Sequence, residues 1–367
     1  MSKALIFADM HIHAHKGSID RLSDCLKALN WVFNTAHERH IKHIFFLGDL
    51  FHEQGKIDVL NYLRTFEVFM QHMLTDARDI DVHLLVGNHD MYHKQQWDVN
   101  SIKPLTAIPR VRIIDKPTTE TIDGRVIDWM PHIENPIKSL EDLKAGRKNM
   151  SLLLGHLAVS GAALNTYYGT KSDVIVEYDN EMRYVDESVF GDWDLTLLGH
   201  YHGSQKLAGG KVEYVGTPLQ ISFGEAFQQK HVIILNLETM EKEYVVNDFS
   251  PKHFLVSPDD IENEAYDLNG QFVRVIAEDL SAKGIVDLKH KVKTQYQVAS
   301  FDFKSKDKKV EDEQNIVEEA RQILMQEGEM LDLWIQESQK ANQIPASITD
   351  LGHLLDIGKD ICSEKAA

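Results

Sequence analysis

The strongest constraint in this sequence is a repeated pattern in which an apolar run leads directly into metal-binding types of side chain. Leu84, Leu85 and Val86 run into Gly87-Asn88-His89-Asp90, which places an amide, an imidazole and a carboxylate on one glycine turn. The same pattern follows four other apolar runs, at Asp9-Met10-His11, Gly48-Asp49-Leu50-Phe51-His52, Gly155-His156 and Gly199-His200-Tyr201-His202. The chain is therefore expected to deliver these groups at the ends of strands.

The N-terminal part of the chain alternates between strand and helix patterns. Buried strands are predicted by continuous apolar runs at 4–8, 44–47 and 82–86. Helices are predicted by apolar residues at helical spacing over 22–36 and 60–73. This order predicts parallel pairing through right-handed crossovers. Because ligands collect at the carboxyl ends of such strands, Asp9, Asp49 and Asn88 are expected at one edge.

The second half of the chain predicts more strands and a separate small unit. Strand patterns lie within 111–130 and at 151–154, 212–215, 232–237 and 243–246, and we expect them to form a largely antiparallel sheet. The predicted fold is an α/β two-sheet sandwich flanked by helices, occupying residues 1–250. After Pro251 and Pro258, a β-α-β-like pattern predicts a small α+β capping domain at 260–303, followed by a helical segment at 310–367.

Charge, cysteines and hydropathy exclude several classes of protein. The formal net charge of -18 argues against a general electrostatic grip on nucleic acid. Cys25 and Cys362 are the only cysteines and form no CxxC motif, which makes a disulfide framework or a thiolate metal site improbable. No apolar run approaches the length of a membrane span and no export signal is visible, so we expect no membrane association and a cytoplasmic location.

The polar side chains at the strand ends predict a metal site with mixed oxygen and nitrogen ligands. Such a set suits manganese, iron or zinc rather than an all-oxygen magnesium or calcium site. Seven ligands exceed one ion, so a shared carboxylate, with Asp49 as the candidate, would hold two cations roughly 3.5 to 4 Å apart. Each group alone has an ordinary explanation as a turn or a solvated histidine, but their joint occurrence argues against it. The predicted ligands are Asp9, His11, Asp49, Asn88, His156, His200 and His202.

Taken together, these five motifs resemble the signatures of the calcineurin-like metallophosphoesterases. Two further stretches, at 156–162 and 214–225, resemble the SbcD branch of that superfamily, the nuclease subunits of DNA double-strand-break processing complexes. The stretch at 115–119 is similar to the tailed-phage recombination endonuclease subunits within that branch. The resemblance covers residues 1 to about 240, extends less fully to the capping domain, and reaches the C-terminal helices only by arrangement.

The resemblance implies a role for each motif residue. One metal would be held by Asp9, His11, Asp49 and His202, and the other by Asp49, Asn88, His156 and His200. His89 falls at the family's position for protonating the leaving oxygen, and His52 at the position that supports the scissile phosphate. For Asp90, two roles remain open, namely orientation of His89 and formation of the turn.

Some residues depart from the family pattern or have only an ordinary explanation. His13 and His15 are interpreted as solvated loop histidines rather than extra ligands. Lys16 and Lys94 lie near ligand loops and are candidates for phosphate contacts, although single loop lysines are usually only solvated. The apolar stripe of the second helix is a candidate for homodimerisation, as in the family, or for ordinary core packing; it comprises Leu60, Leu63, Phe66 and Phe69.

The resemblance implies a Mn²⁺-dependent DNA exonuclease and endonuclease with two Mn²⁺ ions per chain, or Mg²⁺, Fe²⁺ or Zn²⁺ in their place. It also implies a phage-encoded subunit in the host cytoplasm, acting in recombination, repair and replication. Its partners would be DNA, an SbcC-like coiled-coil ATPase bound by the C-terminal helices, and a second copy of itself. Two alternatives stay open, a phosphatase or cyclic-nucleotide phosphodiesterase of the same superfamily, and a non-catalytic scaffold subunit on the same fold.

Overall fold

The computed structural model describes residues 2–14, 18–76, 79–93, 96–133, 135–147, 150–163, 185–277 and 281–305. His15, Lys16, Lys94, Cys362 and the predicted helical segment at 310–367 lie outside these ranges. The chain divides into two units, one spanning Met1–Lys252 and the other beginning at His253. Each unit is described by itself.

The first sheet of the N-terminal unit has six strands in the order β14-β13-β1-β2-β3-β6. Their bounds are β1 (Lys3–Phe7), β2 (His43–Phe46), β3 (Asp81–Leu85), β6 (Val111–Ile114), β13 (His231–Asn236) and β14 (Lys242–Val246). The four strands β1, β2, β3 and β6 pair in parallel, as the alternation of strand and helix predicts. Strands β13 and β14 extend the sheet beyond β1 in antiparallel fashion. This arrangement brings the carboxyl ends of β1, β2 and β3 side by side.

The second sheet also has six strands, in the order β11-β12-β10-β9-β8-β7. Their bounds are β7 (Thr118–Ile122), β8 (Arg125–Met130), β9 (Met150–His156), β10 (Trp193–Gly199), β11 (Gln205–Leu207) and β12 (Val212–Tyr214). The expectation of a largely antiparallel sheet is wrong, because β8, β9, β10 and β12 pair in parallel and only the outer pairs are antiparallel. The central strands are continuous apolar runs buried on both faces, which is typical of parallel sheets.

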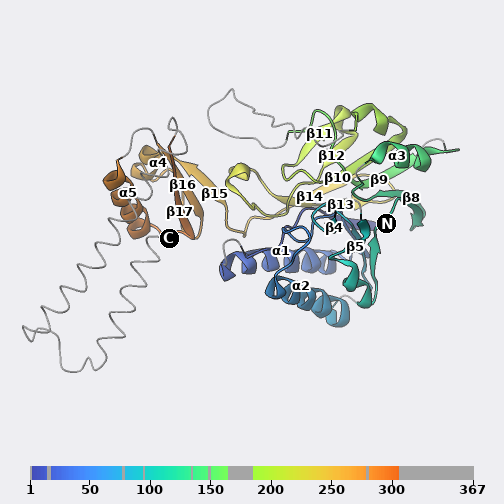
Figure 1. Ribbon diagram of the computed structural model, residues 1–367, viewed down its shortest axis with the longest axis horizontal. Helices are drawn as coiled ribbons and strands as arrows, with labels where there is room; N and C mark the ends of the chain where they lie inside the picture. Colours follow the sequence, from blue (N-terminus) through green and yellow to red (C-terminus); the bar gives the residue numbers. More distant parts are fainter. Residues whose placement is uncertain are drawn as a thin grey trace, which may run out of the picture. The chain divides into compact units, whose positions relative to one another are not determined.

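Helices cover the outer faces of both sheets, so the unit has four layers (Figure 1). The long helices α1 (Ile19–Glu38) and α2 (Val59–Gln71) pack on the first sheet, and α3 (Pro136–Lys144) packs on the second. Both long helices begin at a capping side chain, since Ser18 and Asp58 accept N–H groups of the first turn. A π-helical turn, η2 (His72–Asp76), continues α2.

The core follows the alternation of side chains along the strands. Leu5 and Phe7 of β1 contact the helix layer, whereas Ala4 and Ile6 face the second sheet. In β9, Leu153 faces the outer helix and its neighbour Leu152 faces the first sheet. An apolar layer between the sheets therefore fixes their mutual position, and with it the position of the strand ends.

The remaining elements of this unit are short. A hairpin of β4 (Met91–His93) and β5 (Gln96–Asn100) follows the Gly87-Asn88-His89-Asp90 motif. Within the described residues of this unit, four 3₁₀ turns complete the fold: η3 (Lys103–Ala107), η4 (Glu187–Asp192), η5 (Ala208–Gly210) and η6 (Phe223–Glu225). Among the residues that the structure describes, no helix is long and apolar enough to cross a membrane.

The described part of the second unit, residues 253–277 and 281–305, contains a three-stranded parallel sheet with two helices. Its elements are β15 (His253–Val256), α4 (Pro258–Glu262), β16 (Phe272–Ala277), α5 (Ala282–Gln295) and β17 (Ser300–Ser305). Val273 and Val275 of the central strand are fully buried against Ile261 and Val292 of the helices. The β-α-β order predicted for the segment is present, with a further strand before Pro258. The three strands pair in parallel and alternate with the helices, however, so the arrangement is α/β rather than the predicted α+β.

Candidate metal centre

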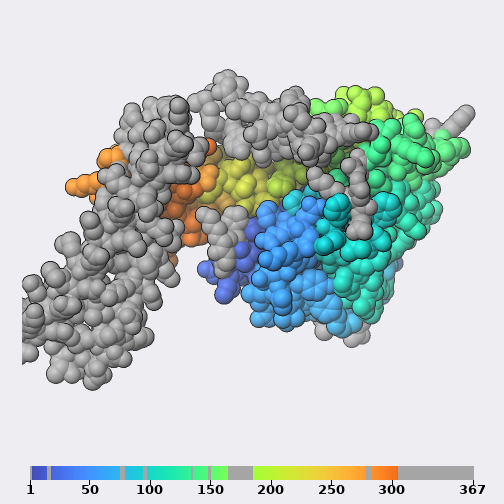
Figure 2. All heavy atoms as spheres, in the orientation of Figure 1, coloured from blue at the N-terminus to red at the C-terminus, as the bar shows by residue number. Residues whose placement is uncertain are grey.

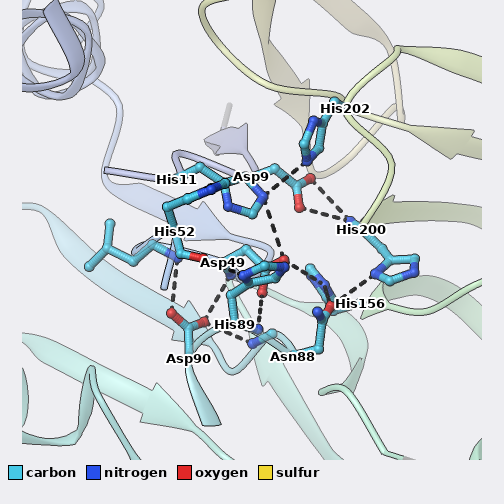
Figure 3. A network of polar contacts seen from close by, with 12 residues as sticks. Asp9, His11, Asp49, His52, Asn88, His89, Asp90, His156, His200 and His202 are labelled. Carbon is cyan, nitrogen blue, oxygen red and sulfur yellow. Dashed lines mark hydrogen bonds and ion pairs between the residues drawn. The ribbon is translucent and has the colours of Figure 1, made fainter. Parts of the chain in front are cut away.

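The predicted site residues lie at the carboxyl ends of strands from both sheets and converge on one place (Figure 3). Asp9 and His11 follow β1, Asp49 and His52 follow β2, and Asn88 and His89 follow β3. His156 ends β9, while His200 and His202 follow β10. The sheet interface thus brings together residues that lie far apart in the sequence.

Tight backbone turns at the strand ends carry several of these side chains. Asp9, His11, Asp49 and His200 all have positive φ angles, between 45° and 108°, a region that side-chain-bearing residues seldom occupy. Gly87 lies so close to Asp49 that a Cβ atom there would collide with the Asp49 carboxylate. The loops therefore accept local strain and close packing in order to aim the side chains inward.

Asp49 lies at the centre of the cluster. Its carboxylate oxygen is 3.4 Å from His156 Nε2 and 3.7 Å from His11 Nε2, and its other oxygen accepts the N–H of His89 at 2.8 Å. Two groups of side chains have ligand atoms close enough to hold a metal ion, and Asp49 belongs to both: His11, Asp49 and His89, and Asp9, Asp49 and His156. This agrees with a shared carboxylate between two cations.

Asn88 and the remaining histidines complete the two sides of the cluster. Asn88 Oδ1 lies 2.9 Å from His156 Nε2 and 3.0 Å from His200 Nδ1. On the other side, His202 Nε2 lies 3.1 Å from His11 Nε2. All seven predicted ligands are therefore brought together, although their role as ligands stays a prediction.

The pairing of residues differs in detail from the predicted ligand sets. Asp9 lies with Asp49 and His156, and its carboxylate accepts the backbone N–H of His200. His89, predicted as a proton donor, has a ring nitrogen within reach of the group formed by His11 and Asp49. Both groups of ligand atoms therefore meet at Asp49, and a ring nitrogen of His89 lies beside one of them.

Burial and the attraction between acids and imidazoles set the protonation of the cluster: attraction to Asp49 and Asp9 outweighs burial and raises the pKa of His156 to about 9. Burial raises the pKa of Asp9 to about 7, although the charge on His156 opposes the rise. Burial would also raise the pKa of Asp49, but the hydrogen bond and attraction to His156, together with attraction to His11 and His89, outweigh burial and hold that pKa well below its ordinary value. Burial lowers the pKa of His11 and of His200 well below the ordinary value, which favours the neutral imidazole that a metal requires.

The donor set fits divalent cations bound by oxygen and nitrogen. The Nε2 atoms of His11 and His202 lie 3.1 Å apart. A proton on one of these nitrogens can be donated to the other, but there is then no room for a proton on both. A cation that accepts both lone pairs, together with the Asp49 carboxylate, satisfies all three groups. Imidazole and carboxylate ligands of this kind suit manganese, iron and zinc.

The contacts of Asp90 favour one of the two roles that the sequence left open for it. Asp90 does not contact the His89 ring; its carboxylate accepts the backbone N–H groups of Gly87, Asp49 and Leu50. His89 is oriented by a carbonyl, because its Nδ1 donates to the backbone oxygen of His52 at 2.5 Å. Of the two alternatives for Asp90, the structure supports the loop-forming carboxylate.

His13 is not the solvated loop histidine that the sequence suggested. It is 7% exposed, its Nδ1 contacts the carbonyl oxygen of His11 at 2.6 Å, and its ring stacks on His52 at 4.3 Å between centroids. The Ile12 backbone pairs with Phe51, which draws the first and second loops together and buries the histidine between them. His13 therefore supports the position of His52.

Sequence reasoning missed several residues beside the cluster. His132 follows β8 and stacks on His200 with 6.1 Å between ring centroids. Its signal was an apolar strand followed by Pro131 and histidine, the same pattern without the glycine. Glu225 and Lys230 form a buried ion pair at 2.7 Å behind His202. Glu225 ends the 214–225 stretch that resembles the SbcD branch, whereas no sequence pattern marked Lys230.

The predicted stripe on α2 divides into a buried and an exposed part. Phe69 is fully buried and Phe66 packs against the core, whereas Leu60 and Leu63 are 38% and 48% exposed. Val59 beside them is 81% exposed. Figure 2 shows the light-blue segment that contains this helix at the surface of the first unit.

Comparison with known proteins places these observations in a family. The sequence pattern of the family described as calcineurin-like phosphoesterase matches residues 2–204. Exonuclease subunit 1 of Enterobacteria phage T4 is 31% identical over 175 residues, which cover 47% of this chain and 47% of that protein.

Two bacterial relatives described as subunits of the nuclease SbcCD also match. The protein from Staphylococcus saprophyticus is 25% identical over 183 residues, covering 50% of this chain and 43% of the relative. The protein from Escherichia coli K12 is 23% identical over 270 residues, covering 65% of this chain and 66% of the relative. The chain thus matches about half the length of the first two relatives and less than two thirds of the third.

Proposed function

The chain belongs to the calcineurin-like phosphoesterase family, and from this premise we propose that it is a DNA nuclease that hydrolyses phosphodiester bonds with two Mn²⁺ ions. Its relatives include an exonuclease subunit and SbcCD nuclease subunits, and the resemblance of the 214–225 stretch to the SbcD branch points the same way. The observation that carries the proposal is the position of Asp49, which belongs to both groups of candidate ligands.

The ligands of the two ions are proposed to be those that the family resemblance implies. Asp9, His11, Asp49 and His202 would hold one ion, and Asp49, Asn88, His156 and His200 the other. When bound, two such cations would neutralise charge on the attacking and leaving oxygens of the phosphodiester. Mg²⁺, Fe²⁺ and Zn²⁺ are alternatives that the ligand types also allow.

His89 is proposed as the residue that protonates the leaving oxygen. Its Nδ1–H is committed to the carbonyl of His52, so Nε2 is the atom that exchanges a proton with the substrate. Its ring lies 4.8 Å from that of His11 between centroids, which places it at the edge of the cluster. A positioned imidazole of this kind typically contributes a factor of about 10² to 10⁴ to the rate.

His52 is proposed to support the scissile phosphate. Its ring stacks on that of His13, at 4.3 Å, and lies nearly parallel to that of His89, at 5.9 Å between centroids. This stacking limits the directions in which the imidazole can point. The residue is partly exposed, as a group that contacts substrate must be.

The remaining parts of the proposal concern partners. The unit that contains residues 260–303 would contact DNA as a capping domain, and residues 310–367 would bind an SbcC-like coiled-coil ATPase. The exposed residues Val59, Leu60 and Leu63 of α2 are the proposed surface for a homodimer. With 15 acidic against 8 basic residues from 300 to 367, the C-terminal segment is itself a poor DNA-binding tail.

An assay on end-labelled linear DNA tests the activity. We expect Mn²⁺-dependent cleavage of double-stranded and single-stranded DNA by the full chain, with and without its ATPase, and no cleavage by Asp49→Asn. Turnover on phosphomonoesters and cyclic nucleotides in the same buffer measures the alternative activities within the family. Absence of DNA cleavage at every enzyme concentration, or preferential turnover of the small substrates, would overturn the proposal.

A further inference from the structure

A buried carboxylate lies directly behind one of the candidate metal ligands. Glu225, at the end of η6, has Oε1 3.3 Å from His202 Nδ1, and the opposite ring nitrogen of His202 faces the cluster. Because a carboxylate only accepts, this contact places the imidazole proton on Nδ1. The lone pair of Nε2 is then directed toward His11 and the metal centre.

Glu225 is itself held from several sides. Thr217 Oγ1 donates to its Oε2 at 2.8 Å, and Lys230 Nζ lies 2.7 Å from the same oxygen. Lys230 also donates to the backbone carbonyl of His202 at 3.0 Å. One lysine therefore fixes both the carboxylate and the backbone of the histidine that the carboxylate orients.

Burying this ion pair costs free energy, so stability alone does not explain its presence. Glu225 is 1% exposed and Lys230 is 6% exposed. A buried ion pair seldom stabilises a fold more than an apolar pair of the same volume, since both charges lose their hydration. The pair lies in the loop between β12 and β13, where apolar side chains such as Leu219 and Ile221 already fill the core.

We propose that Glu225 is a positioning residue that holds the Nδ1–H tautomer of His202, and that Lys230 fixes Glu225 for this purpose, so that His202 Nε2 binds a divalent cation. Carboxylates hydrogen-bonded to metal-binding histidines typically change metal affinity by about 10- to 100-fold. The inference rests on the two-cation site of the proposed function, but it does not require DNA to be the substrate.

A matched pair of variants tests the inference. Glu225→Gln removes the charge that holds the His202 proton. Glu213→Gln changes another buried glutamate that is paired with a lysine, Lys242, and with Tyr244, but that contacts none of the candidate ligands. Mn²⁺ titration by calorimetry should show one site weakened about 10- to 100-fold in Glu225→Gln and both sites unchanged in Glu213→Gln.

Nuclear magnetic resonance of ¹⁵N-histidine-labelled full chain gives a second readout that needs no variant. In the metal-free protein at alkaline pH, His202 should carry its proton on Nδ1, and Glu225→Gln should shift the population toward Nε2–H. A wild-type His202 protonated on Nε2 overturns the inference even if the variant fails to fold. Equal loss of affinity in both glutamine variants, or no loss in Glu225→Gln, also overturns it. A wild-type protein that binds two Mn²⁺ ions but cleaves no DNA would end the nuclease proposal alone.

Discussion

The carboxylate of Asp90, in the loop after β3, accepts the backbone N–H of Asp49 at 2.8 Å. This loop therefore holds Asp49 in place, the residue that both candidate ligand groups share. Asp90 is buried, and it also accepts the N–H groups of Leu50 and Gly87. Burial, followed by repulsion from Asp49, raises its pKa to about 7. The Asp90 carboxylate therefore connects the loop after β3 to the loop after β2.

Replacing Asp90 is expected to lower both the stability of the protein and its affinity for Mn²⁺. Asp90→Ala leaves three buried N–H groups without their acceptor, at about 1 to 3 kcal/mol each, so the free energy of unfolding in urea should fall by at least about 3 kcal/mol. Asp58→Ala is the control, because Asp58 also accepts backbone N–H groups but caps α2 at the surface. That variant should lose about 1 kcal/mol and keep its Mn²⁺ affinity; equal losses in both variants would contradict this interpretation.

Metal content should separate the shared ligand from a ligand of one ion. Asp49→Asn is expected to retain neither Mn²⁺ ion after dialysis, because Asp49 belongs to both candidate groups. His200→Ala is expected to retain one ion, since His200 lies only on the side of Asn88 and His156. Elemental analysis of the dialysed proteins measures the stoichiometry. Two ions on Asp49→Asn would remove the basis for a shared carboxylate.

His89→Asn should separate proton transfer from metal binding. If His89 protonates the leaving oxygen, the variant keeps two Mn²⁺ ions while its DNA cleavage rate falls by about 10² to 10⁴. The ring nitrogen of His89 also lies near the ligand atoms of His11 and Asp49, so the opposite result has a clear meaning. Loss of one ion in elemental analysis would make His89 a ligand.

The acid sensitivity of the fold should depend on His83, which lies in β3, away from the ligand loops. Burial, with smaller contributions from His43 and Arg112 against Asp81, lowers the pKa of His83 from 6.5 to about 4. Between these two pH values the unfolded chain binds a proton that the folded chain does not. The contribution to the free energy of unfolding is therefore constant above pH 6.5 and falls as the pH drops toward 4.

His83→Phe tests this dependence while keeping an aromatic ring stacked on Trp129. Relative to the wild type, the variant should lose about 2 to 3 kcal/mol less stability between pH 7 and pH 4.5. Urea unfolding at both pH values measures the difference, with Glu120 remaining as the nearby carboxylate in each protein. Parallel pH profiles for the two proteins would show that His83 does not bind its proton in this range.

Local sequence patterns were sufficient for most strands of the two large sheets, for the two long helices and for the residues that could form the site. The apolar runs ending in Asp9, Asp49 and Asn88 predicted both the parallel sheet and the edge at which these residues lie. Side-chain alternation within a strand and helical spacing within α1 are properties of neighbouring residues, so a single sequence carries them. The motif histidines could be singled out for the same reason.

Only the tertiary structure decided several other contacts between residues that are far apart in the sequence. The sequence did not predict that the second sheet is mainly parallel, that Asp90 joins two loops, that His13 is buried on His52, or that Glu225 lies behind His202. Each of these contacts depends on how the two sheets pack and on where an irregular loop returns. Local pattern sets the type of element and the chemistry available at its end, whereas the packing of distant elements determines the partner of each buried charge.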